Sequence, residues 1–357
     1  MLQDFVFIDM TLGYALKNKL TGVEEAILLK RKIAELSRII FDIPAVCLKE
    51  HEGLMAAEPM DVRVCVRPVT DELKKAHDLG CSRVRLSCGG PVDKKALPSL
   101  REALSEAGRL GMKATVGCID ISEKSPVGVE IFQKLAEEYE IHSVVVHDYG
   151  SRLDPLATCW TLADMRQRIG CAIEYGGKNA LGLATGNTLG AIRSGICAVS
   201  ASIGGVGGFP AFEEVLMGMR HLFKMPVKVP KNIALCCKEA LELIGADVPN
   251  TKPIIGSNIF AHESGIHVDG VIKKSDLYEP FAPEEVGLSR RIVIGKHSGR
   301  AAVEQKVREL NIRMEPACIA LLLDRVRSLA VKQKAALADE QLERLAREVV
   351  VCEGACY

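Results

Sequence analysis

The chain has 357 residues, 48% of them apolar, with 46 basic and 46 acidic side chains and no net charge. This length allows one large domain with a smaller appendage, and a neutral balance without blocks of like charge excludes a surface built for nucleic acid. Apolar stretches stay shorter than the roughly 18 residues of a membrane span. Met1–Met10 shows no signal-peptide pattern. We therefore expect a cytoplasmic protein with no membrane contact.

Short runs rich in Val, Ile and Leu alternate with longer stretches whose apolar residues recur every three or four positions, as far as about residue 225. In chain order the predicted strands are 5–8, 38–41, 62–66, 83–86, 113–118, 143–146, 171–173 and 198–203. The predicted helices include 22–36, 70–79, 97–110, 129–138 and 154–169. Strands and helices in this alternation predict an α/β fold, a (β/α)8 TIM barrel. An open doubly wound sheet is the alternative, but Ile8–Tyr14 lacks the glycine-rich turn which that fold requires.

The chain is predicted to have three segments. These are the barrel at residues 1–228, a linker or lid at 229–300, and a small α-rich C-terminal subdomain at 301–357. Pro226 and Pro230 mark the end of the barrel, and a helix is expected at 232–244. Glycine and histidine are frequent from residue 255 to residue 300, and the remainder is helical and highly charged.

Thirteen cysteines are scattered along the chain, many inside apolar runs such as Val62–Val66. A thiol in such a run behaves as a small apolar side chain. In a long chain without an export pattern we therefore predict free structural thiols, not a disulfide framework.

Three motifs follow the predicted barrel in the order His262-Glu-Ser-Gly-Ile-His-Val-Asp-Gly270, Tyr278-Glu-Pro-Phe281 and Gly295-Lys-His-Ser-Gly299. Together they closely resemble the motifs of the homocitrate synthase and isopropylmalate synthase family. Asp9–Leu12 and Gly182–Leu189 match the barrel of that family, so the resemblance covers about residues 5–305. We expect no large regulatory domain of the kind typical of isopropylmalate synthases, which favours the homocitrate synthase type.

The resemblance implies a divalent metal that holds a 2-oxo acid in the barrel mouth, where the deprotonated methyl group of acetyl-CoA attacks the keto carbon. The implied ligands are an acid after strand one and two histidines of an H-x-H motif on strand seven. Here the acid is replaced by Tyr14, and the histidines by Gly176 and Lys178. An arginine is likewise replaced by Gly13. We therefore expect no metal ligands and no cofactor bound by this chain.

Three loops at the barrel mouth also depart from the family pattern. They lie at 89–91, 119–123 and 207–210. The first and last are compact, and the second carries Glu123 where the family has an arginine. These changes agree with the loss of all the implied ligands.

The motifs beyond the barrel keep the family residues. In that family this segment crosses a dimer and completes the active site of the partner. The resemblance implies catalytic positions at His267, Tyr278 and Glu263, and substrate-binding positions at His262, Ser264 and His297. A barrel without ligands and an intact lid resemble the ω subunit of the two-subunit, α and ω, homocitrate synthases of nitrogen-fixing anaerobes.

Three functions stay open. The leading hypothesis is one subunit of a heteromeric homocitrate synthase, whose partner barrel supplies the divalent metal and binds acetyl-CoA and the 2-oxo acid. The second is a non-catalytic pseudoenzyme with a regulatory or binding role. The third is a metal-independent aldol-type enzyme with Lys178 as a Schiff-base lysine. For Asp9 we favour a structural role because the family residues that follow it are replaced. We do not expect His147 and Asp148 to form a catalytic pair, since adjacent strand residues point in opposite directions.

Overall fold

A computed structural model describes residues 5–48, 62–89, 92–121, 126–264, 270 and 273–354. Internal contacts divide the chain into two compact units, Met1–Val248 and Pro249–Tyr357. The helix expected at 232–244 is α11 (Ile233–Glu242), and it packs on α2 (Val23–Ala34) of the barrel. The first unit therefore extends about one helix beyond the predicted barrel end at residue 228.

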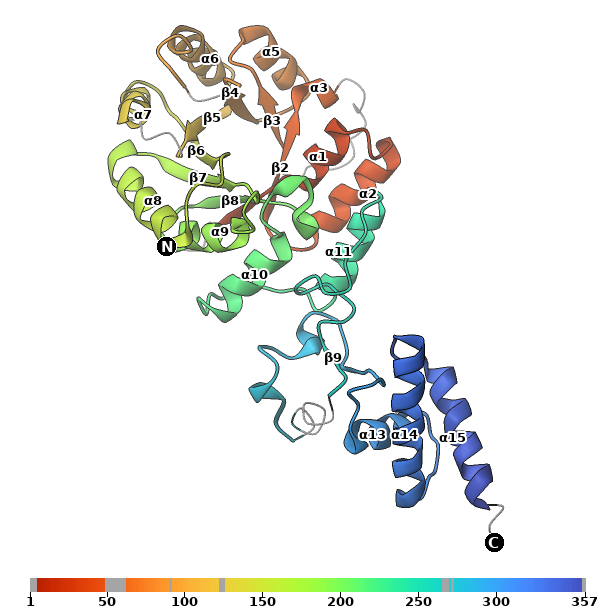
Figure 1. Cartoon of the computed structure of the whole chain (residues 1–357). Coiled ribbons are helices and arrows are strands. Elements are labelled where there is room, and N and C mark those ends of the chain that lie inside the picture. Colours follow the sequence, from red (N-terminus) through yellow and green to blue (C-terminus); the bar gives the residue numbers. More distant parts are fainter. Residues whose placement is uncertain are drawn as a thin grey trace. The chain divides into compact units, whose positions relative to one another are not determined.

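The first unit is a closed barrel of eight parallel strands in sequential order, in which β1 pairs with both β2 and β8. The strands are β1 (Val6–Asp9), β2 (Ile39–Pro44), β3 (Val62–Val66), β4 (Arg83–Ser87), β5 (Lys113–Asp120), β6 (Ser143–Asp148), β7 (Ala172–Gly177) and β8 (Ala198–Ala201). All eight predicted strands are present, and the predicted TIM barrel is confirmed (Figure 1).

Helices surround this barrel on its outer side (Figure 1). Besides α2 and α11 they are α1 (Thr11–Lys17), α3 (Ala45–Leu48), α5 (Thr70–Asp78), α6 (Leu97–Arg109), α7 (Pro126–Glu138), α8 (Pro155–Ile169), α9 (Ala184–Arg193) and α10 (Phe212–His221). The longer helices bury apolar residues spaced by three or four positions, as with Leu100 and Leu104 of α6. The carboxylate of Asp154 caps α8 by accepting hydrogen bonds from the N–H groups of Leu156 and Ala157, both at 2.8 Å.

Several strand ends at the barrel mouth differ from the prediction, since β2, β5 and β6 run on to Pro44, Asp120 and Asp148. β7 continues through Gly176 and Gly177, which pair with His147 and Asp148 of β6. Glycine has a low strand propensity, but pairing with the neighbouring strand β6 extends β7 over both residues. The strand expected to reach residue 203 ends at Ala201, and the 3-10 segment η1 (Ile203–Gly208) follows.

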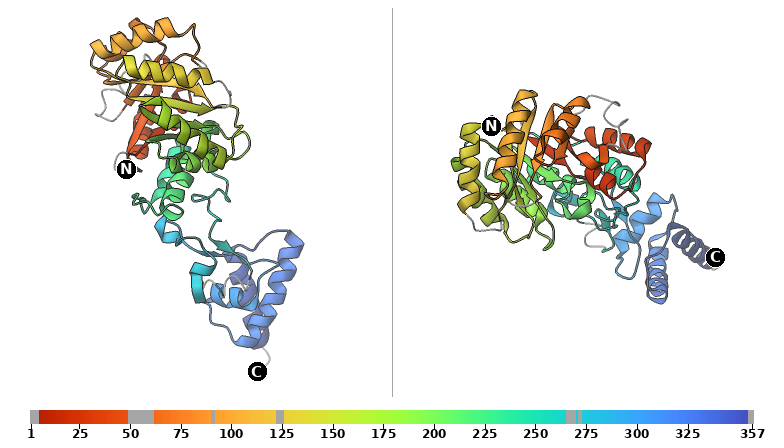
Figure 2. Two further views of the ribbon diagram at one scale, coloured as in Figure 1. Left: turned by 90° about the vertical axis from the view of Figure 1, so that its left-hand side faces the viewer. Right: turned by 90° about the horizontal axis from the view of Figure 1, so that it is seen from above.

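The second unit contains a short parallel pair, β9 (Ala261–His262) and β10 (Arg291–Ile292), and the 3-10 turns η2 (Ser275–Leu277) and η3 (Pro283–Glu285). Three helices follow, α13 (Arg300–Glu309), α14 (Pro316–Gln333) and α15 (Asp339–Gly354) (Figure 1 and Figure 2). They enclose a separate apolar core that includes Val303, Leu322 and Leu342. The predicted α-rich C-terminal part is thus confirmed.

No helix in the described part of the chain combines the length and the apolar character needed to cross a membrane. The cysteines of the described residues for which a state is assigned are free thiols, from Cys47 on α3 to Cys318 on α14. This agrees with the prediction of structural thiols.

Candidate functional site

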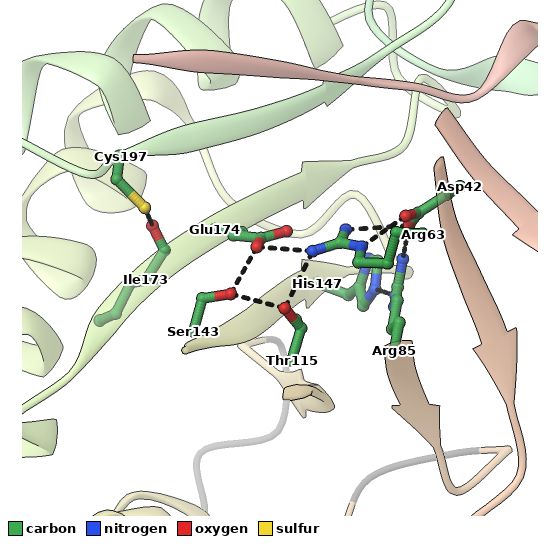
Figure 3. Close-up of polar contacts among 9 residues, drawn as sticks. All are labelled: Asp42, Arg63, Arg85, Thr115, Ser143, His147, Ile173, Glu174 and Cys197. Carbon is green, nitrogen blue, oxygen red and sulfur yellow. Dashed lines mark hydrogen bonds and ion pairs between the residues drawn. The ribbon is translucent and has the colours of Figure 1, made fainter. Parts of the chain in front are cut away.

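The interior of the barrel carries a buried polar network (Figure 3) in addition to apolar side chains such as Ile8 and Ile40. At its centre Arg63 of β3 forms a bidentate ion pair with Asp42 of β2, at 2.6 and 3.0 Å. The same guanidinium donates to Glu174 of β7 at 2.7 Å and to Thr115 of β5 at 3.1 Å. Ser143 of β6 completes this layer by donating to Glu174 at 2.6 Å.

A second layer lies between β4 and β6. Arg85 donates to Asp42 at 2.8 Å and contacts Nε2 of His147 (Figure 3). The other ring nitrogen of His147 lies 3.2 Å from the carbonyl oxygen of Gly176. Burial, and then the nearby Arg85 cation, lower the pKa of His147 to about 3. Its imidazole is therefore neutral at physiological pH and acts as a fixed polar spacer inside the barrel.

Position 176 has no room for a side chain beside this imidazole. A Cβ atom added to Gly176 would lie 2.7 Å from Cε1 of His147 and even closer to Nδ1. Because β7 side chains alternate between its two faces, residue 176 points to the same side as Glu174, into the barrel. The ring of His147 thus fills the volume in which the implied histidine would begin.

The other substituted positions contact the loop that follows β8. Lys178 donates from Nζ to the carbonyl oxygen of Gly207 at 3.0 Å and lies 3.3 Å from the ring centroid of Phe209. Burial, and then the charge of Lys17, lower the pKa of its ammonium to about 8. A Cβ atom on Gly207 would lie 2.8 Å from the ring of Tyr14, so the phenol packs closely on the same loop.

The donors at the three implied ligand positions do not fit a divalent cation. They offer a phenol, a residue without a side chain and an ammonium, and none of these is a usual ligand for such an ion. No cluster of three or more His, Cys, Asp or Glu side chains able to hold a metal occurs among the described residues. A Cβ atom at position 13 would lie 2.5 Å from the carbonyl oxygen of Asp42, so the implied arginine does not fit there either.

Asp9 has the structural role that the sequence favoured. Its carboxylate accepts hydrogen bonds from the backbone N–H groups of Thr11 at 3.0 Å and Leu12 at 2.8 Å, at the start of α1. His147 and Asp148 do not act as a pair. Asp148 accepts instead from the backbone of Arg152 at 3.0 Å, while His147 belongs to the barrel network.

The second unit brings part of the predicted lid residues together. His262 on β9 lies 3.4 Å from Glu279, and the carboxylate of Glu263 accepts a hydrogen bond from the backbone N–H of His297 at 2.9 Å. The Glu263 contact ties β9 to the turn after β10, and it leaves the side chain of His297 exposed.

The other predicted lid residues have different settings. Ser264 is half-buried directly after β9, and Tyr278 is 41% exposed beside η2. His267 lies outside the described residues. The predicted roles of all these side chains stay predictions.

Two sequence families match the chain. An HMGL-like family model matches residues 54–237, and a model of the homocitrate synthase post-HMGL domain matches residues 254–334. The chain is 32% identical to homocitrate synthase 1 of Nostoc sp. over 324 residues, which are 86% of this chain and 84% of that protein. This chain belongs to the homocitrate synthase and isopropylmalate synthase family.

A second sequence relative and a solved structure are also similar to this chain. The chain is 35% identical to 2-isopropylmalate synthase 2 of Caldanaerobacter subterraneus over 259 residues, covering 71% of this chain and 67% of that one. The HMG-CoA lyase of Bacillus subtilis superimposes with a TM-score of 0.56 at 15% identity, over 70% of this chain and 96% of that chain. At this low identity the superposition supports the barrel fold alone.

Sequence reasoning missed the interior network. Its signal was present, because Asp42, Arg63, Arg85 and Glu174 each stand inside a predicted or extended strand flanked by apolar residues. A charged residue in a strand that is covered by helices on its outer face must point into the barrel, and it needs a partner there. What the sequence could not supply was the pairing across strands far apart in the chain.

Proposed function

We propose that this chain is one subunit of a heteromeric homocitrate synthase and lends its post-barrel segment to the barrel of a different chain. Family membership supports an acetyl-CoA-dependent condensation with a 2-oxo acid. The specific reaction we propose joins acetyl-CoA, 2-oxoglutarate and water to give homocitrate and CoA. We further propose a cytoplasmic complex that serves nitrogen fixation.

The contrast between the two units carries this proposal. In the barrel, His147, which contacts Arg85, occupies the space beside position 176, and Lys178 is held by Gly207 and Phe209. In the second unit the family residues are retained, and Glu263 joins two of the three motifs through His297. If the chain had no part in the reaction, we would not expect the motifs after the barrel to be retained while the barrel positions are replaced.

The proposed division of labour follows from this contrast. The partner barrel would supply the divalent metal, the missing arginine and the pocket for the oxo acid. This chain would supply His267 as the acid–base or polarising group and Tyr278 beside it. Glu263 would hold the motif segments in place through its contact with the His297 backbone, while His262, Ser264 and His297 would line the substrate side.

Reconstitution tests the proposal. The full chain alone should show no synthase activity and no stoichiometric manganese or zinc by mass spectrometry. Mixed with a family barrel that has both metal motifs intact, it should give homocitrate, and His267→Ala should lower kcat at least 100-fold. His77→Ala, on the surface of α5, is the matched control and should stay within twofold. Tight metal binding and turnover by the lone chain would refute the division of labour.

The two other functions make different predictions. A regulatory pseudoenzyme would bind the partner barrel, yet its effect on partner activity would survive His267→Ala. A Schiff-base enzyme would be trapped on Lys178 by borohydride in the presence of a 2-oxo acid, a reaction that the lowered pKa of this amine favours. Its contacts with Gly207 and Phe209 favour the charged ammonium in a structural role, so we rank this function last.

A further inference from the structure

Glu279, the residue directly after Tyr278, is a tightly held carboxylate in the second unit. Its side chain is 3% exposed. It accepts hydrogen bonds from Nε of Arg290 at 3.1 and 3.0 Å and from Nη2 at 2.7 Å. Its Oε1 atom also lies 3.4 Å from Nε2 of His262. A buried carboxylate with a bidentate guanidinium partner is geometrically well defined, unlike a surface ion pair.

The two partners of Glu279 belong to the strand pair. His262 lies on β9, and Arg290 directly precedes β10. The strands are joined by backbone hydrogen bonds from Arg291 to Phe260 at 3.0 Å and from Val293 to His262 at 2.9 Å. Glu279 therefore attaches the chain around Tyr278 to a platform that is itself hydrogen-bonded.

The turn that carries Tyr278 is shaped by backbone hydrogen bonds and by aromatic packing. The N–H groups of Tyr278 and Glu279 both donate to the carbonyl oxygen of Ser275 at 2.9 Å, which shapes the turn but does not anchor it. An edge-to-face contact between Phe281 and Phe260, with centroids 5.4 Å apart, holds its far end. The Tyr278 ring lies against Gly270, where an added Cβ atom would be 2.5 Å from Cε2.

We propose that Glu279 is a positioning residue that fixes the Tyr278 phenol for its work in the partner active site. Because the two residues are adjacent, the buried carboxylate sets the backbone from which the exposed phenol projects. This inference rests on the proposed function, since Tyr278 needs a fixed place only if it serves a reaction. Glu279 itself touches no substrate in this scheme and acts through Tyr278.

A double-mutant cycle in the reconstituted complex tests the inference. Glu279→Gln keeps the shape of the side chain and removes the charge that Arg290 requires. We expect kcat to fall about tenfold with KM within twofold, as for loss of a group that acts in the transition state. In a Tyr278→Phe background the same change should have little further effect, because both act through one hydroxyl. Multiplicative losses would overturn the proposal and leave Glu279 a purely structural residue.

A matched control and a second measurement keep the outcomes separate. Glu284→Gln removes a different, 66% exposed carboxylate that lies 3.4 Å from the same Arg290, and it should change kcat less than twofold. Hydrogen exchange of the full chain alone should be faster over residues 273–281 in Glu279→Gln than in the wild type, with α14 unchanged. Unchanged exchange there would refute the positioning role. Loss of wild-type activity on reconstitution would instead refute the proposed function, and the exchange result would still stand.

Discussion

At the scale of single residues, the substituted ligand positions are filled, not vacant. His147 is hydrogen-bonded on one side to Arg85 and on the other to the carbonyl oxygen of Gly176. Protein interiors are close-packed, so a residue that occupies such a space excludes any side chain later added to it. The packing around His147 therefore requires a glycine at position 176. The same glycine removes one of the implied metal ligands.

Gly176→Ala should consequently destabilise the barrel by about 1–3 kcal/mol through overpacking against His147. The cost should be smaller in a His147→Ala background, because the obstructing ring is then absent. Urea unfolding of the two single variants, the double variant and the wild type measures the coupling. Gly170→Ala is an unsuitable control because its φ of 75° adds backbone strain, whereas Gly108→Ala meets no atom within 4 Å and should cost nothing. Additive effects at 176 and 147 would show that the ring does not fill the site.

Asp9 gives a pH-dependent prediction. Burial raises its pKa from 3.8 to about 6. The folded protein thus binds this proton more tightly than the unfolded chain, so the contribution to stability is present below pH 3.8 and is lost as the pH rises through 6. Between pH 7 and pH 4 the wild type should gain stability over Asp9→Asn by up to about 3 kcal/mol, the equivalent of this pKa change. A difference in unfolding free energy that does not vary with pH would contradict the assignment.

At the scale of elements, the interior network joins strands that are distant in sequence. Arg63 connects β3 with β2 through Asp42 and with β7 through Glu174. Replacing buried ion pairs as a set is often tolerated, but removing a single partner leaves a buried charge without compensation. One guanidinium therefore links β2, β3 and β7, and Arg85 of β4 is a second cation on Asp42.

Arg63→Met should destabilise the barrel by about 3–5 kcal/mol, because it leaves Glu174 buried without its cation and Asp42 with Arg85 alone. Arg67→Met is the control. That side chain is 77% exposed in its pair with Glu72, and its loss should cost less than about 1 kcal/mol. Chemical unfolding followed by circular dichroism measures both values. Equal losses for the two variants would mean that the network is not a determinant of stability.

At the scale of the whole molecule, the two units have separate apolar cores. The core of the second unit consists of residues from 292 to 349 and includes Ala302, Val326 and Ala346. A segment with its own core and short connections meets the physical conditions for independent folding.

The fragment 249–357 should therefore fold alone as a largely helical domain with a cooperative thermal transition. Circular dichroism of the fragment measures this directly. Val326→Ala, which removes two methyl groups at a fully buried position, should lower its Tm by several degrees. Exposed Val331 on the same helix gives the matched control, since Val331→Ala should leave the Tm unchanged. A fragment without helical structure would show that the second unit depends on the barrel for folding.

The sequence by itself determined the barrel, its strand order, the helical C-terminal part and the family. These follow from the local alternation of apolar runs and from ordered motifs, and both are properties of neighbouring residues. The hydrogen-bond partners of Asp9 are local as well, since they lie two and three residues away.

Only the tertiary structure decided which side chains pair inside the barrel and which contacts hold the segment around Tyr278. Arg63 and Glu174 are 111 residues apart in sequence, Arg85 and His147 are 62 apart, and Glu279 finds His262 at a separation of 17. Such contacts depend on which side chains meet once the strands have closed, and no local pattern encodes that meeting. Closure of the barrel thus brings four charged side chains into one network. It also places the ring of His147 where a side chain at position 176 would lie.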